Sequence, residues 1–195
     1  PRLAETILQK SEKISDGPPP VYLLATEKKL NQDNGKIAKK CIGSPSGVCD
    51  RGKEKVLMVV GATGAGKTTL INGMVNYILG VEWADKFRYK LVVEDSKVSQ
   101  AFSQTRDITA YTIYPMKGSA IPYAFTIIDT PGFGDTGGLK RDKEITNQVK
   151  EFFSIPPPDG IDHLDCIGFV TQASLARLTP TQEYIFDSKI GRAHV

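Results

Sequence analysis

The segment from Val56 to Gly80 constrains the fold of this chain more than any other part of the sequence. Val56 to Val60 is an unbroken apolar run of strand length, which is typical of a strand buried on both faces of a parallel sheet. A glycine-rich segment follows. From Lys67 onward apolar residues recur at helical spacing until Gly80, a residue common at helix C-termini. The sequence therefore predicts a strand, a glycine loop and a helix in direct succession.

The loop between this strand and helix, Gly61 to Thr68, satisfies the pattern G-x-x-x-x-G-K-[ST]. Its glycines allow backbone N–H groups to turn inward around a phosphate, and the helix that begins there adds the positive end of its dipole. Lys67 is expected to bridge the β- and γ-phosphates of a nucleotide and Thr68 to ligate Mg²⁺. A purely structural glycine turn would need neither the lysine nor the hydroxyl.

Asp129 is a second candidate, because it follows the β-rich run from Tyr123 to Ile128 and precedes Thr130-Pro131-Gly132. A carboxylate at the end of a strand is well placed to hold a Mg²⁺-bound water, and Gly132 leaves its N–H available to a γ-phosphate. The pattern D-x-x-G alone is a common turn. After a phosphate loop, the functional interpretation is favoured.

A third hydroxyl is needed between these motifs if the protein senses the nucleotide state, because a loop must then close over Mg²⁺ and the γ-phosphate. Thr105 and Thr109 are the two candidates. We favour Thr105, since it lies in the loop before the predicted strand that starts at Ile108, whereas Thr109 lies inside that strand.

The remaining pattern alternates strands and helices, which predicts an α/β fold. We expect a three-layer sandwich whose sheet is mostly parallel, contains one antiparallel hairpin and has about four strands in this chain. Three further strands are predicted: an antiparallel pair at Ile108–Tyr114 and Tyr123–Ile128, and a strand at Cys166–Val170. Two further helices are predicted. One carries Ile145, Val149, Phe152 and Phe153, and the other is opened by Thr179-Pro180 with Gln182 in its capping box.

Composition restricts the partners and the compartment. The chain has 25 Lys and Arg against 22 Asp and Glu, a net charge of +3, which predicts no nucleic-acid partner. Three cysteines, Cys41, Cys49 and Cys166, form neither a closed disulfide set nor a zinc pattern, so we expect a reducing, cytoplasmic setting. His163 near Cys166 is interpreted as structural. Since no apolar run reaches the ~18 residues that a span needs, none is predicted, and membrane association stays open.

With these motifs in place, a family resemblance can be stated. The phosphate loop, the Ser103-x-Thr105 pair and the segment from Asp129 to Asp135 resemble the septin and immunity-associated (AIG/GIMAP-type) branch of GTPases. Val170-Thr171-Gln172, followed by Arg177 and Thr179, is similar to a box of the immunity-associated GTPases.

The resemblance implies a Mg²⁺-dependent switch that binds GTP and GDP, hydrolyses GTP slowly and forms dimers or larger homo-oligomers. It assigns Lys67, Thr105, Asp129 and Gly132 to catalysis, and Thr68, Thr105 and Asp129 to the metal. It assigns the phosphates to Gly61, Ala62, Thr63, Gly64, Ala65, Gly66, Lys67, Thr68 and Thr69.

We expect the chain to be divided into three segments, of which the resemblance accounts for the second. Residues 1–54 are expected to form an N-terminal helix, on the spacing of Leu3, Ile7, Leu8 and Ile14, followed by a linker or loosely packed extension. Residues 55–189 are expected to be the N-terminal two-thirds of a G domain, truncated at its C-terminus. Residues 190–195 are expected to be a non-native tail.

The chain also departs from the family pattern. Residues 81–102 are longer than the corresponding loop, and Trp83, Phe87 and Tyr89 there suggest a packed insertion. The guanine-specificity box would follow the helix that begins at Pro180 and is not seen, so guanine preference rests on resemblance alone. Phe133 stands where Ras-like enzymes carry a water-orienting Gln, which predicts slow turnover. A phosphate-loop ATPase or kinase, or an assembly module with little hydrolysis, are the alternatives.

Overall fold

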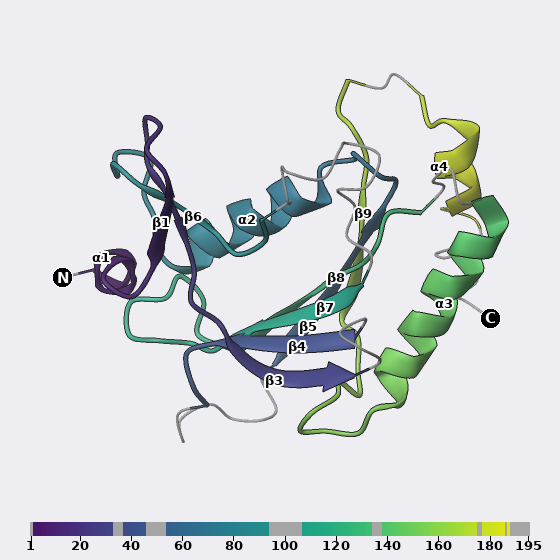
Figure 1. Cartoon of the computed structure of the whole chain (residues 1–195), viewed down its shortest axis with the longest axis horizontal. Helices are drawn as coiled ribbons and strands as arrows, with labels where there is room; N and C mark the ends of the chain where they lie inside the picture. The colour runs from purple at the N-terminus through teal and green to yellow at the C-terminus, as the bar shows by residue number, and fades with distance from the viewer. Residues whose placement is uncertain are drawn as a thin grey trace.

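The computed structural model describes residues 2–32, 37–45, 54–93, 107–133, 138–174, 177–185 and 187. Its main sheet has six strands in the order β3-β4-β7-β8-β5-β9 (Figure 1). These strands are β3 (Glu27–Gln32), β4 (Ile37–Ile42), β5 (Lys55–Gly61), β7 (Ile108–Ile113), β8 (Phe125–Asp129) and β9 (Cys166–Val170). The pairs β4–β7, β5–β8 and β5–β9 are parallel, whereas β3–β4 and β7–β8 are antiparallel.

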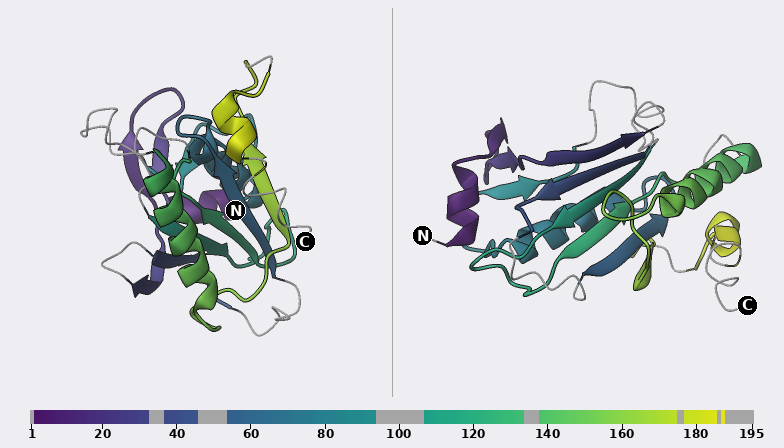
Figure 2. Two further views of the ribbon diagram at one scale, coloured as in Figure 1. Left: turned by 90° about the vertical axis from the view of Figure 1, so that its right-hand side faces the viewer. Right: turned by 90° about the horizontal axis from the view of Figure 1, so that it is seen from below.

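Helices cover both faces of this sheet, as Figures 1 and 2 show, so the predicted three-layer α/β sandwich is confirmed. The helices are α1 (Leu3–Leu8), α2 (Lys67–Ile78), α3 (Gly138–Ser154) and α4 (Pro180–Ile185). Because side chains of a strand alternate between its faces, Val59 packs in the cluster that contains α2, while its neighbour Val60 packs in the cluster that contains α3.

All four predicted strands are present, and the β7–β8 pair is antiparallel as expected. The helix α4 also begins as the sequence predicts. The backbone N–H of Thr179 donates to Gln182 Oε1 at 2.9 Å, and Gln182 N–H donates to Thr179 Oγ1 at 3.3 Å. This reciprocal pair is the predicted capping box.

The expectation of a linker or loosely packed extension after the N-terminal helix is corrected by the described residues of that segment, which form strands. Strands β3 and β4 form a hairpin whose second strand pairs with β7 and extends the main sheet. Two adjacent lysines interrupt the apolar pattern of β4, so this strand resembles a polar segment in the sequence. Lys39 Nζ reaches back to the carbonyl oxygen of Pro158 at 3.0 Å, and Lys40 Nζ lies 5.8 Å from the centre of the Tyr111 ring. Both ammonium groups therefore have partners inside the fold.

The predicted N-terminal helix is shorter than its apolar spacing indicated. Helix α1 ends at Leu8, and Ile14 lies instead in β1 (Glu12–Ser15). Strand β1 pairs with β2 (Val21–Leu23), which pairs in turn with β6 (Arg88–Lys90) to form a separate three-stranded sheet. A helix this short gains little from its own hydrogen bonds, so the strand pairing decides the conformation of the second half.

Two asparagines one turn apart join this small sheet to α2. Asn76 Oδ1 accepts the N–H of Tyr89 at 2.9 Å and Asn76 Nδ2 donates to the Tyr89 carbonyl at 2.8 Å. Asn72 does the same for the residues that follow, accepting from Leu91 N at 2.8 Å and donating to Val92 O at 2.9 Å. The two amides therefore take the place of a neighbouring strand along the free edge of β6.

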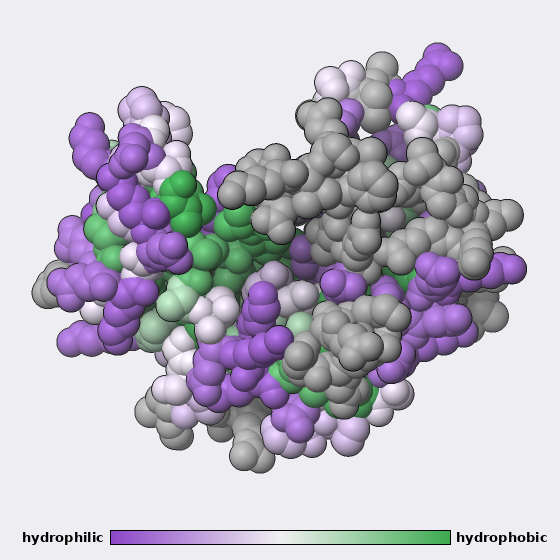
Figure 3. Space-filling model, viewed as in Figure 1, coloured by the Kyte–Doolittle hydropathy of each residue, from purple (hydrophilic) through white to green (hydrophobic). Residues whose placement is uncertain are grey.

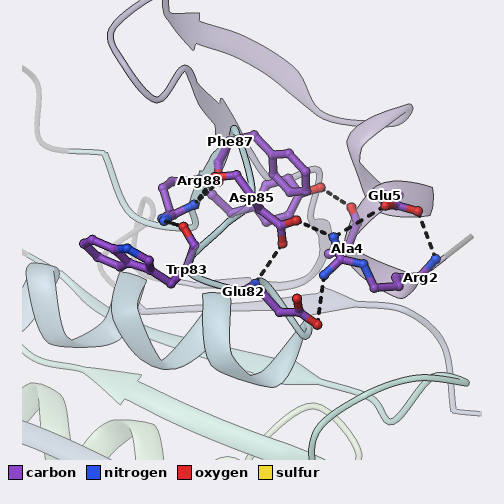
Figure 4. Close-up of polar contacts among 9 residues, drawn as sticks. Arg2, Ala4, Glu5, Glu82, Trp83, Asp85, Phe87 and Arg88 are labelled. Carbon is purple, nitrogen blue, oxygen red and sulfur yellow. Dashed lines mark hydrogen bonds and ion pairs between the residues drawn. The ribbon is translucent and has the colours of Figure 1, made fainter.

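Charged and aromatic contacts hold α1 against the segment that follows α2 (Figure 4). The guanidinium of Arg2 contacts the carboxylates of Asp85 and of Glu82, the latter at 3.2 Å, and it lowers the pKa of Asp85 below its ordinary value. The predicted packing of the insertion is confirmed for Phe87 and Tyr89, whose side chains are buried. It is wrong for Trp83, whose side chain is 94% exposed.

Figure 3 shows apolar residues gathered in a hollow of the surface. Helix α2 has two exposed large side chains, Leu70 and Tyr77, which are 40% and 67% exposed. Among the residues that the structure describes, no helix combines the length and the apolar character needed to cross a bilayer.

We predict that Asn76→Ala destabilises the chain by about 1–3 kcal/mol, because it leaves the buried N–H and C=O of Tyr89 without their partners. The gain in helix propensity offsets only about 0.5 kcal/mol of this loss. Denaturant unfolding measures the effect. Asn147→Ala is the matched control, since Asn147 is an exposed asparagine of α3 and its replacement should be neutral or slightly stabilising. Equal unfolding free energies for the two variants would contradict the role of Asn76.

Candidate functional site

The phosphate loop leaves the carboxyl end of β5 and enters α2 at Lys67, as predicted. Gly64 and Gly66 have φ angles of +73° and +101°, which only glycine adopts readily. A Cβ added to either glycine would meet nothing within 4 Å, so both positions face open space. Gly66 contributes no side-chain cap to α2. The first backbone N–H groups of this helix are therefore suited to an anion.

Lys67 is 8% exposed and its ammonium group lies within the loop. Nζ donates to the carbonyl oxygens of Gly61 and Ala62, both at 3.1 Å. The Ala65 N–H also donates to the Ala62 carbonyl, at 3.1 Å, and this hydrogen bond closes a tight turn. The structure therefore places the one positive charge of the loop against the carbonyl oxygens at the start of the loop.

Asp129 lies at the end of β8 beside this loop, because β8 and β5 are parallel neighbours in which Val59 faces Asp129. Its carboxylate is 1% exposed. Burial, and to a smaller extent the Asp129 charge, raises the pKa of Tyr111 to about 12. The carboxylate is thus held in a dry environment, in which a cation is attracted strongly.

The residues after Asp129 pack directly on the phosphate loop. Thr130 Oγ1 donates to the Val59 carbonyl at 2.8 Å, and Phe133 N–H donates to the Gly61 carbonyl at 3.2 Å. Gly132 approaches Thr63 so closely that a Cβ on this glycine would lie 2.8 Å from the Thr63 Cα. The structure therefore brings the two predicted motifs into contact, and it explains why glycine is required at position 132.

Phe133 is 3% exposed and belongs to the hydrophobic cluster between the sheet and α3. Its backbone forms an isolated bridge with Ala62. Phe133 therefore packs against the sheet.

The donor set fits Mg²⁺. Thr68, in the first turn of α2, offers a hydroxyl oxygen, and Asp129, on the adjacent strand, offers a carboxylate oxygen. Mg²⁺ prefers oxygen ligands and commonly takes one or two from protein, the rest coming from phosphates and water. Within the described residues no cluster of three or more His, Cys, Asp or Glu side chains could hold a metal by itself.

The threonine predicted to sense the nucleotide, Thr105, lies outside the described residues, as do residues 190–195. The competing candidate, Thr109, is in β7 as expected and faces Asp129 across the antiparallel pair. Thr69 is exposed in the first turn of α2, and Arg177 is exposed before α4.

The sequence did not predict two contacts that other segments make with the phosphate loop. The side-chain amide of Gln172, two residues after β9, donates to the Gly64 carbonyl at 2.9 Å. Val170, the last residue of β9, places its carbonyl oxygen 2.6 Å from where a Cβ on Gly61 would lie. The sequence contained no signal for either contact, since each joins segments more than a hundred residues apart.

A separate cavity of about 860 Å³ lies at the opposite end of the sheet, near the start of β5 and β8. Lys39, Glu54 and His163 are among its lining residues. His163 Nδ1 lies 2.9 Å from Asp162 Oδ1, and this hydrogen bond raises the pKa of His163 above its ordinary value. His163 is therefore engaged with protein groups at a distance from the phosphate loop.

The fold and the loop together define an α/β protein with a phosphate-loop motif, consistent with the P-loop NTPase-like class. The family model described as Septin matches residues 51–153, more than half of the chain. The chain therefore belongs to the septin family.

A curated relative agrees with this assignment. The chain is similar to Protein peanut of Drosophila melanogaster, with 34% identity over 92 residues. The match covers 44% of this chain and 14% of that protein, so the chain corresponds to a small part of its relative. No solved structure matches the chain. The septin part of the predicted resemblance is confirmed, and the immunity-associated part stays a prediction.

We predict that Gly132→Ala destabilises the chain by about 1–3 kcal/mol, because the added methyl group overlaps Thr63 and forces the two motifs apart. Gly73→Ala is the matched control. Gly73 lies in α2 with nothing within 4 Å of a built Cβ, so alanine there should stabilise the chain by roughly 1 kcal/mol. Thermal and denaturant unfolding of both variants measure the difference. Similar effects at the two glycines would show that the close approach at position 132 is absent.

Proposed function

We propose that this chain is the phosphate-binding part of a Mg²⁺-dependent guanine-nucleotide switch that hydrolyses GTP slowly. The observation that carries the proposal is the direct contact between the two motifs. The glycine loop, with the Lys67 ammonium group bound to its first carbonyl, and the segment from Asp129 to Gly132 meet at one edge of the sheet. Membership of the septin family supports guanine as the base.

We propose the following roles for the residues of the site. Backbone N–H groups of the loop and of the first turn of α2 would bind the phosphates, and Lys67 would neutralise their charge. Thr68 and Asp129 would hold Mg²⁺, either directly or through water, and the Gly132 N–H would meet the γ-phosphate. We retain Thr105 as the proposed third hydroxyl, which would contact Mg²⁺ only in the closed state.

Slow hydrolysis is proposed because position 133 supplies no side chain to the attacking water. Phe133 is buried in the core, where Ras-like enzymes have a glutamine that orients the water. The same observation favours a second candidate function, a nucleotide-dependent assembly module that hydrolyses little and acts by forming dimers or homo-oligomers. Phosphate release measured as a function of protein concentration separates the two, because turnover per chain should depend on concentration only if assembly completes the site.

We also propose a reducing, cytoplasmic setting. Among the described residues, Cys41 is a buried and Cys166 an exposed free thiol. An exposed free thiol is uncommon in oxidising compartments.

We predict that Lys67→Ala abolishes triphosphate binding, because the ammonium group is the charge that the phosphates meet. Calorimetry with GTP and with ATP measures the affinity and at the same time tests the proposed guanine preference against the ATPase or kinase alternative. Lys143→Ala is the matched control, since Lys143 is an exposed helical lysine of α3. Unchanged affinity in the Lys67 variant would contradict the role of the loop, and tighter binding of ATP than of GTP would contradict the proposed base.

We predict that Asp129→Asn weakens nucleotide binding in Mg²⁺ by about tenfold or more while changing binding in EDTA much less, since the variant keeps the shape of the side chain and loses its charge. Calorimetric titrations in the two buffers measure the ratio. Asp159→Asn, at an exposed loop position, is the control. Equal losses with and without the metal would mean that Asp129 acts on the fold and not on Mg²⁺.

A further inference from the structure

The middle of the phosphate loop is held by one side chain from another part of the chain. Gln172 Nε2 donates to the Gly64 carbonyl at 2.9 Å, across 108 positions of sequence. The Lys67 ammonium group donates to the carbonyls of Gly61 and Ala62, at the start of the loop. Gln172 and Lys67 therefore hold different parts of the same loop.

The position of Gln172 is fixed by the strand that precedes it. Strand β9 pairs with β5 in parallel, with Val170 opposite Gly61. The Val170 carbonyl oxygen would be only 2.6 Å from a Cβ on Gly61, so the strand end lies directly against the base of the loop. Two residues further along, the Gln172 side chain is within reach of Gly64 without any rearrangement.

Such a contact matters most at the two glycines of the loop, because they have no side chains to pack. A Cβ added to Gly64 or Gly66 would meet nothing within 4 Å, although Ala65 between them is buried and Thr63 packs against Gly132. Glycine loses more conformational freedom on becoming ordered than any other residue. A hydrogen bond that fixes the Gly64 carbonyl restricts the peptide between Gly64 and Ala65 before any ligand arrives, which lowers the cost of ordering the loop upon binding.

We propose that Gln172 is a positioning residue for the phosphate loop, which holds the loop in its binding conformation through the Gly64 carbonyl. The proposal rests on the proposed function in that the ligand is taken to be a nucleotide. Gln172 itself touches no phosphate. A hydrogen bond of ordinary strength corresponds to a change in affinity of about threefold to tenfold, and this is the loss expected when the amide is removed.

The test uses Gln172→Met, which keeps the length of the side chain and removes its N–H donor. The probe is N-methylanthraniloyl-GDP titrated in Mg²⁺ into the whole chain. Gln9→Met is the matched control, because Gln9 is an exposed glutamine after α1, in the small sheet's half of the molecule. We expect Gln172→Met to bind the probe about threefold to tenfold more weakly than the wild type, and Gln9→Met to bind it equally well.

Two further measurements separate positioning from general stability. The melting temperature without nucleotide should be the same for both variants, because each residue is exposed. Hydrogen exchange in the nucleotide-free chain should be faster at the Ala65 amide, which donates to Ala62 within the loop, only in Gln172→Met. Unchanged affinity, or a loss matched by a lower melting temperature, would overturn the proposal.

Failure of the proposed function has a different signature. If the wild-type chain does not bind the probe, the nucleotide assignment is wrong, and the exchange experiment alone then decides the role of Gln172. Faster exchange at Ala65 in Gln172→Met would support positioning of the loop, and equal exchange would overturn it.

Discussion

Strand β5 and its two parallel neighbours determine where every part of the candidate site lies. Because β8 and β9 flank β5 in parallel, the carboxyl ends of all three strands meet at one edge of the sheet. The phosphate loop leaves β5 at this edge, Asp129 ends β8 on one side, and Gln172 follows β9 on the other. Strand β5 is held in place because it is buried on both faces, and this fixes the position of the loop that follows the strand. The chemistry therefore depends on strand pairing as much as on the loop's own residues.

The sequence predicted the parts of the fold whose signals are local. The apolar run from Val56 to Val60 requires burial on both faces, and no other element offers this as well as a central parallel strand. The capping box at Thr179 is specified within four residues. The loop from Gly61 to Thr68 and the turn after Asp129 carry their constraints in glycine, lysine and hydroxyl positions, so the candidate site could be placed before any contact was known.

The parts that could not be predicted depend on contacts between distant segments. Lys39 and Lys40 break the apolar pattern of β4, and only the Pro158 carbonyl and the Tyr111 ring explain how two lysines are accommodated there. In the sequence, Asn72 and Asn76 look like ordinary polar residues of a helix, and their role is seen only because β6 lies beside them. Gln172 was noted as part of a family box, but its contact with Gly64 depends on the register of β9.

The N-terminal strands also have a consequence for how the chain folds as it is synthesised. The hydrogen bond from Lys39 to Pro158 spans 119 positions, and β4 pairs with β7 some seventy residues later. At a synthesis rate of about 5–20 residues per second, the β3–β4 hairpin emerges several seconds before its partners. During that time the edge of β4 that will pair with β7 is open, and open edges recruit strands of other chains. The lysines of the hairpin, which obscure β4 in the sequence, would give the nascent segment a charge that discourages such premature association.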